Sequence, residues 1–180
     1  MSEITAAVRA DLAPNGRLRV GINYGNAILA RKDPATGESS GVAIQLAREI
    51  GRRLDAPLDI VPYPGPGPLV DGVKARECDL AFLGSDPARE QEISFTPAYM
   101  LLEATYLVKA GSPLRDASEV DREGISVGAP ARANYELFLK RMLHKATLKS
   151  VENAAAAQAL LLSGEVDAMA GLKEALIALA

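Results

Sequence analysis

The chain has 180 residues, of which 48% are hydrophobic and 24% charged, and its net charge at pH 7 is −3. This composition argues against a disordered chain and supplies enough apolar material for an α/β protein with one core or two small ones. The 20 Lys and Arg residues are scattered along the sequence and form no basic stripe. Nucleic acid is therefore not expected as a partner.

The scarcity of cysteine and histidine limits the chemistry of any site. Cys78 is the single cysteine, so neither an intramolecular disulfide nor a Cys-based zinc site can be assembled. His144 is the single histidine, which argues against His-rich metal sites and histidine-based catalytic triads. We expect no metal and no cofactor.

The sequence contains no run of about eighteen apolar residues, so no membrane-spanning helix is predicted. Residues 1–11 lack the basic region, apolar region and cleavage site of a secretory signal. Two expectations stay open from the residues alone: an exported protein whose signal has been removed, or a protein that stays inside the cell.

The first half of the chain alternates strands and helices. Apolar residues with a period of two predict strands, and a spacing of three and four predicts amphipathic helices. Alternation of the two implies right-handed crossovers and a parallel sheet. In chain order we expect a helix in 3–12, a strand at 18–22, a helix at 42–54, a strand at 58–63, a short helix at 69–76 and a buried strand at 80–83.

Proline and glycine mark the turns between these elements. Residues 62–68 hold four prolines and two glycines, which predicts a rigid surface loop. Pro87 follows Ser85 and Asp86, either of which can cap a helix, so a short helix is expected there with Arg89 in its first turn.

A second series of elements follows the polar linker at 111–113, whose composition is typical of a domain boundary. A strand at 104–109 precedes the linker; after it we expect a strand at 125–128, helices at 134–144 and 154–162, and a strand at 166–170. The two halves resemble each other, since each runs strand, helix, then a strand headed by Asp79 or Asp167. Any two βαβ units would look similar at this level.

Five blocks of the sequence carry a family resemblance: LRVGIN, GVAIQLAREIGRRL, VKARECDLAFLGSDPAREQEISFTPAYM, TYLVKAGSP and ALLLSGEVDAMAG. In order and spacing they resemble the amino-acid type of solute-binding proteins that serve ABC transporters. The resemblance extends from Arg17 to about Leu176. It implies an α/β fold of the two-lobed type II periplasmic-binding class, in which each lobe is a mainly parallel sheet flanked by helices.

The resemblance also implies boundaries and partners. We expect an N-terminal arm at 1–16, a first lobe at 17–108 and a second lobe at 109–180. Family members return from the second lobe to the first, and that return segment is absent from this sequence. An uncovered lobe would expose apolar surface and favour a homodimer.

The function implied is binding of a small carboxylate-bearing solute between two lobes, as the periplasmic substrate-binding component of an ABC transporter with a permease as partner. On this interpretation the protein is no enzyme. Two alternatives remain open. One is a cyclohexadienyl-dehydratase-like enzyme with Glu136 or Glu174 as the acid, and the other is a ligand-sensing module that does not serve transport.

Six residues are the candidate ligand contacts by this resemblance: Arg89, Gly84, Ser85, Tyr24, Asn26 and Arg132. Arg89 matches the arginine that grips the ligand carboxylate with a planar fork. Its simpler interpretation is a solvated arginine paired with a neighbouring acid. Gly84 and Ser85 precede the helix start, where backbone N–H groups assist an anion or merely belong to an ordinary cap.

The remaining matches depart from the family pattern. The aspartate that usually holds the ligand's α-amino group falls on Leu172, and the Gly-Ser/Thr pair that opens a helix of the second lobe falls near Arg132 and Ala133. The covering aromatic falls near Asn26, with Tyr24 close by. A keto, hydroxy or dicarboxylic acid therefore fits Arg89 and Arg132 better than a standard amino acid does.

Other chemically versatile residues are expected to be structural. Asp79 and Asp167 lie at strand entrances, where capping a turn is a simpler role than a catalytic carboxylate pair. Cys78, Phe95 and Tyr99 are expected to pack in the core.

Overall fold

The computed structural model describes residues 4–180. The chain folds into two compact units, Met1–Gly84 and Ser85–Ala180, which we call unit 1 and unit 2. Compactness thus groups residues 85–108 with unit 2, whereas the sequence assigned them to the first lobe. The arm at 1–16 and the lobes at 17–108 and 109–180 stay a prediction.

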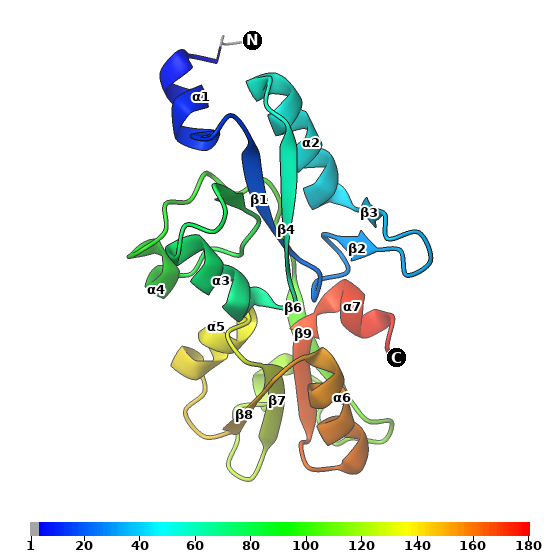
Figure 1. Ribbon diagram of the computed structural model, residues 1–180. Coiled ribbons are helices and arrows are strands. Elements are labelled where there is room, and N and C mark those ends of the chain that lie inside the picture. Colours follow the sequence, from blue (N-terminus) through cyan, green and yellow to red (C-terminus); the bar gives the residue numbers. More distant parts are fainter. Residues whose placement is uncertain (1–3) are drawn as a thin grey trace. The chain divides into compact units, whose positions relative to one another are not determined.

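Unit 1 contains a three-stranded parallel sheet in the order β4-β1-β5. The strands are β1 (Leu18–Asn23), β4 (Leu58–Tyr63) and β5 (Leu80–Ala81). The register of β1 with β4 runs from Leu18 opposite Leu58 to Asn23 opposite Tyr63, and Figure 1 shows the two strands side by side. The parallel arrangement confirms the expectation from the alternating pattern.

The helices of unit 1 are α1 (Ala6–Leu12), α2 (Val42–Leu54) and α3 (Pro66–Lys74), and a small antiparallel hairpin is formed by β2 (Arg31–Lys32) and β3 (Ser39–Ser40). The buried residues of α2 recur at a spacing of three and four, so they form one apolar side of the helix. This side packs against β1 in the same core cluster. The largest fully buried side chains of this unit are Leu18, Val20, Ile22, Ile44, Leu54 and Leu69.

Unit 2 contains a four-stranded sheet in the order β6-β9-β7-β8. The strands are β6 (Ala104–Val108), β7 (Ser126–Pro130), β8 (Thr147–Val151) and β9 (Ala168–Leu172). β7 is parallel to both of its neighbours, and β6 joins the edge antiparallel to β9. The three parallel strands have the same order as those of unit 1, so the resemblance between the two halves of the sequence extends to the sheet topology.

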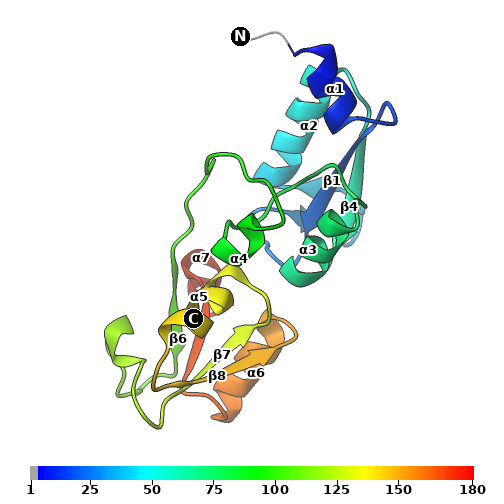
Figure 2. The same cartoon turned by 90° about the vertical axis from the view of Figure 1, so that its left-hand side faces the viewer.

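The helical segments of unit 2 are α4 (Pro87–Glu90), the 3-10 turn η1 (Ala117–Glu119), α5 (Asn134–Met142), α6 (Ala154–Ser163) and α7 (Lys173–Ile177). Figure 2 shows α6 beside β7 and β8, and its buried residues pack with those of β9. The fully buried Val127 and Met169 mark the two sides of this sheet, because they belong to different core clusters.

Several boundaries differ from the sequence prediction. The loop predicted at 62–68 ends early, because α3 begins at Pro66 and also contains Pro68. Proline fits the first turn of a helix, where the backbone N–H groups have no intrahelical acceptor. The prediction of a buried Tyr99 is wrong, since that side chain is 49% exposed. Cys78 is buried as expected.

Within residues 4–180, no helix combines the length and the apolar character needed to cross a bilayer. The same part of the chain contains no group of three or more His, Cys, Asp or Glu side chains arranged to hold a metal ion.

Candidate functional site

The short helix α4 places Arg89 in unit 2. Asp86 is its N-cap, and the Asp86 carboxylate accepts the N–H of Ala88 at 3.0 Å. Pro87 occupies the first helical position, where its fixed φ suits the turn. The predicted cap and helix start are thus correct. Arg89 follows in this turn with only 5% of its surface exposed.

The Arg89 guanidinium is directed at a backbone carbonyl of the same unit. Its Nη2 donates to the carbonyl oxygen of Arg132 at 2.7 Å. Burial lowers the pKa of Arg89; the charge of Asp86 opposes this effect, and the charge of Arg132 adds to it. An arginine pKa starts so high that the group stays a cation at neutral pH. Arg89 is thus a buried cation with one neighbouring anion, Asp86, and one neighbouring cation, Arg132.

A second contact ties α4 to α5. Asp86 is 3% exposed, and its carboxylate forms an ion pair with Nη1 of Arg141 at 2.8 Å. Arg141 lies in the last turn of α5, so this pair and the Arg89 contact anchor α4 at two points. The interpretation of Arg89 as a solvated arginine is wrong, because the residue is buried, and the described ion pair of Asp86 is with Arg141.

The turn that precedes α5 holds Arg132 in a left-handed conformation, with φ at 60°. Its backbone N–H donates to the carboxylate of Glu136 at 3.1 Å. Glu136 is fully buried, and it also accepts from Ser150 at 2.5 Å and pairs with Lys140 at 2.6 Å. Sequence reasoning named Glu136 only as a candidate acid and missed this role. Its position three residues after the N-cap Ala133 was the available signal.

The other predicted contact residues have local partners or exposed positions. In unit 1, the Tyr24 hydroxyl lies 2.5 Å from the Ser39 hydroxyl, and the Asn26 side chain accepts the N–H of Ile28 at 3.2 Å. Gly84 ends unit 1 and Ser85 begins unit 2, and both residues are exposed. Of the six candidates, Arg89 and Arg132 are the pair joined by a described contact within one unit.

Two positions that depart from the family pattern also lie in unit 2. Ala133 is buried as the N-cap of α5, and no side-chain hydrogen bond caps that helix. Leu172 is the last residue of β9 and is partly buried. Neither side chain can accept a hydrogen bond or balance an ammonium group. Neither position therefore supplies a side-chain acceptor.

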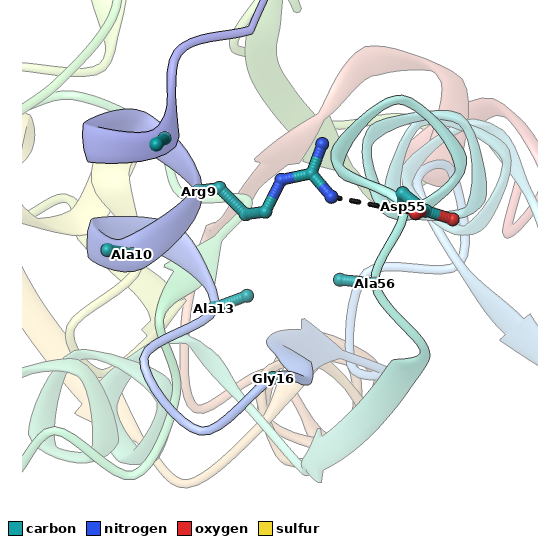
Figure 3. A pocket seen from close by; sticks show the side chains of 7 residues that line it. Arg9, Ala10, Ala13, Gly16, Asp55 and Ala56 are labelled. Carbon is teal, nitrogen blue, oxygen red and sulfur yellow. Dashed lines mark ion pairs between the residues drawn. The ribbon is translucent and has the colours of Figure 1, made fainter.

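Two hollows elsewhere in the units involve none of the six predicted residues. One, of about 280 Å³, lies beside α1, with the ion pair between Arg9 and Asp55 at its edge (Figure 3). The other, of about 210 Å³, is lined by residues that include Lys109 and Asp167. Arg89 and Arg132 line neither of these two hollows.

Comparison with known protein families gives a match over residues 18–154 to the bacterial extracellular solute-binding proteins, family 3. Among solved structures, the chain is similar to a putative binding component of an ABC transporter from Wolinella succinogenes complexed with lysine. The identity is 25%, the TM-score is 0.74, and the alignment covers 88% of this chain and 69% of the other.

Two further structures share the fold. An amino acid ABC transporter substrate-binding protein from Streptococcus pneumoniae bound to L-arginine has 20% identity and a TM-score of 0.78, with 96% of this chain and 73% of that one covered. The ancestral amino acid-binding protein AncCDT-1, a precursor of cyclohexadienyl dehydratase, has 24% identity and a TM-score of 0.76, with 91% and 73% covered.

These likenesses confirm the predicted α/β fold of the type II periplasmic-binding class. The family match spans most of the chain and includes both Arg89 and the turn at Arg132. The chain belongs to the bacterial extracellular solute-binding proteins, family 3.

Proposed function

We propose that this protein captures a small carboxylate-bearing solute that lacks an amine next to the carboxylate, and that it delivers the solute to an ABC transporter permease outside the cytoplasm. The observation that carries the proposal is the buried Arg89 guanidinium with Arg132 as its neighbour. Keto, hydroxy and dicarboxylic acids offer the planar acceptor that a guanidinium binds with two parallel hydrogen bonds.

The residues around this arginine support a ligand without an amine. Leu172 occupies the position where the resemblance implies an aspartate for the α-amino group, and Ala133 provides no hydroxyl. Burying an ammonium group without an acceptor weakens binding by several kcal/mol, because its lost hydration is not replaced. Amino acids such as lysine and arginine, which relatives bind, are therefore disfavoured as ligands here.

We further propose that the protein binds without catalysis. The dehydratase alternative needs a carboxylic acid that can deliver a proton to its substrate. Glu136 is fully buried and paired with Lys140 and Ser150, which leaves it suited to a structural role. Glu174 is exposed in the first turn of α7. No arrangement of the described residues favours either side chain as such an acid.

The test is ligand-induced stabilisation measured by thermal unfolding and confirmed by calorimetry. Matched ligand pairs isolate the amine: 2-oxoglutarate against glutamate, and pyruvate against alanine. We expect the keto acids to raise the melting temperature more than the amino acids. Binding should weaken by about tenfold or more in Arg89→Ala, since each charge-assisted hydrogen bond contributes roughly 1.5–3 kcal/mol.

Two variants serve as controls for the arginine. Arg89→Lys keeps the charge and loses the planar fork, so it should bind more weakly than the wild type. Arg115→Ala removes an exposed arginine and should leave binding unchanged. The proposal fails if the amino acids stabilise the protein more than their keto counterparts, or if Arg89→Ala binds the keto acids as the wild type does.

A further inference from the structure

We propose that Glu136 is a positioning residue for the Arg89 anchor and acts through the backbone of Arg132. This inference rests on the proposed function, because it assigns to Glu136 the task of holding the carboxylate-binding guanidinium in place. The described contacts form one continuous path in unit 2. Glu136 accepts from the N–H of Arg132, and the carbonyl of Arg132 accepts from Arg89.

Arg132 needs outside support because of its backbone conformation. Its φ of 60° lies in the left-handed region, which is strained for a residue with a side chain. The neighbouring N–H of Ala133 donates to the carbonyl of Pro130 at 3.2 Å, and the N–H of Ala131 donates to Val151 at 2.7 Å. The N–H of Arg132 is held by the carboxylate of Glu136.

Glu136 is itself fixed on both oxygens. Oε2 accepts from Arg132, while Oε1 receives the Ser150 hydroxyl and the Lys140 ammonium. A fully buried carboxylate with three donors, two of them on Oε1, is held in one orientation, because rotation would break all three contacts together. Glu136 therefore holds the peptide group between Ala131 and Arg132, which is the first half of the turn.

The consequence concerns the orientation of the planar Arg89 guanidinium group. A guanidinium has five N–H donors in a fixed plane, and the bond from Nη2 to the Arg132 carbonyl restricts the rotation of that plane. The other donors then face a constant direction. Without Glu136, the N–H of Arg132 loses its acceptor, and the strained turn that presents the Arg132 carbonyl to Arg89 is held less firmly, although the N–H of Ala133 still donates to Pro130.

The first experiment requires no ligand. Nitrogen-15 NMR of the arginine side chains measures how fast the Arg89 Nε–H exchanges with water, with the signal assigned by its loss in Arg89→Lys. We expect Glu136→Gln to speed this exchange by about tenfold, the factor for roughly 1.4 kcal/mol. The Nε–H of Arg19 in unit 1, bound to Asp79 at 3.1 Å, is the internal reference and should not change.

The matched control is Glu123→Gln, which removes the same charge from an exposed residue of unit 2. It should leave the Arg89 signal at its wild-type exchange rate. The inference is overturned if Glu136→Gln folds and Arg89 exchanges as in the wild type. It is also overturned if the Arg19 signal accelerates by the same factor, because that result would mean general loosening.

Should Glu136→Gln fail to fold, Ser150→Ala decides the question. It removes one donor to Oε1 and keeps the charge of Glu136 and its contact with Arg132. Oε1 then keeps only the half-exposed Lys140 among its two described donors, so the carboxylate is held less tightly, and a smaller acceleration of about two- to threefold at Arg89 is expected because one of three contacts is lost. An unchanged rate in this variant contradicts the inference.

The second experiment measures binding of 2-oxoglutarate by calorimetry. If the wild type binds in an Arg89-dependent manner, Glu136→Gln should raise the Kd by about tenfold. Unaltered binding in Glu136→Gln would refute the positioning role and leave the proposed function standing. If the wild type binds no carboxylate, the proposed function fails, and the exchange measurement still decides what holds Arg89.

Discussion

Asp79 and Arg19 are joined by a reciprocal contact between β5 and β1 in unit 1. The Asp79 carboxylate accepts the backbone N–H of Arg19 at 2.9 Å and its Nη2 at 2.6 Å, while the N–H of Asp79 donates to the Arg19 carbonyl at 2.8 Å. In unit 2, Asp167 makes the same backbone exchange with Ser126, at 2.8 Å and 2.9 Å. Both aspartates therefore lock the first and third parallel strands together, which agrees with the structural role expected for them.

The first prediction compares Asp79, whose partner is an arginine side chain, with Asp167, whose partner is a serine. Burial raises the pKa of Asp79, but the hydrogen bonds and the charge of Arg19 outweigh that effect and lower it overall. Asp79→Asn should thus reduce the free energy of unfolding by about 1–2 kcal/mol, measured by urea denaturation. Asp167→Asn should reduce the free energy of unfolding by less, because the side-chain partner of Asp167 is Ser126 rather than an arginine. Equal losses in the two variants would contradict the argument.

The second prediction concerns acid sensitivity at Asp121. Its carboxylate accepts three successive N–H groups, those of His144, Lys145 and Ala146, at 2.8–3.2 Å. The bonds from Ala146 and Lys145 lower the pKa of Asp121 most; burial opposes them, and His144 adds a smaller lowering.

A carboxyl whose pKa is lower in the folded state contributes stability above its unfolded value of about 3.9, and this contribution is lost as the pH falls through the folded value. Asp121→Asn should accordingly be less stable than the wild type at pH 6, and the difference should shrink at and below about pH 4. Unfolding curves at several pH values measure it. Asp11→Asn, on the exposed side of α1, is the control. A difference that stays constant down to pH 2 would rule out this origin.

The elements predicted most accurately are those whose bounds depend on residues within the element itself. The helix at 42–54 has the predicted bounds, because its apolar spacing and its glycine N-cap are both local features. β8 escaped prediction because it is an edge strand whose residues are only partly buried, so strict alternation is weak. The start of α3 at Pro66 was predicted wrongly because four prolines were taken to exclude a helix, although the first turn of a helix accommodates proline.

In the candidate site, too, features set by neighbouring residues could be predicted, and contacts between distant residues could not. Arg89 and its cap could be found because Asp86 and Pro87 form a recognisable helix start. The acceptor for Arg89 could not, since it is the backbone carbonyl of Arg132, 43 residues away, and a carbonyl carries no side-chain signal. The place of Glu136 in the first turn of α5 signalled a role at the helix start, but its complete burial depends on tertiary packing and could not be predicted from the sequence.

The third prediction uses the left-handed turn at Arg132. Arg132→Gly and Arg132→Ala remove the same side chain, but only glycine adopts φ at 60° without strain. The glycine variant should therefore exceed the alanine variant by about 1 kcal/mol in the free energy of unfolding. Both should bind 2-oxoglutarate more weakly if the Arg132 side chain contacts the ligand. Chemical denaturation and calorimetry measure the two effects, and equal stability of the variants would argue against a strained turn.

The last prediction tests the missing amine acceptor. Leu172 ends β9 in the same unit as Arg89, and it belongs to none of the core clusters. Leu172→Asp introduces a carboxylate at the position where the family resemblance implies one, so an ammonium group would gain a charged partner. The ratio of glutamate to 2-oxoglutarate affinity should rise by about tenfold or more.

Leu172→Asn separates charge from size, because the amide has the shape of the aspartate without its charge. It should shift the affinity ratio much less than Leu172→Asp does. Calorimetric titration of each variant with both ligands gives the ratio directly, and a melting curve checks that the replacement is tolerated at this partly buried position. If the aspartate variant keeps the wild-type ratio while folding normally, position 172 does not meet the ligand. The preference for amine-free carboxylates would then need another cause, such as the second positive charge that Arg132 places beside Arg89.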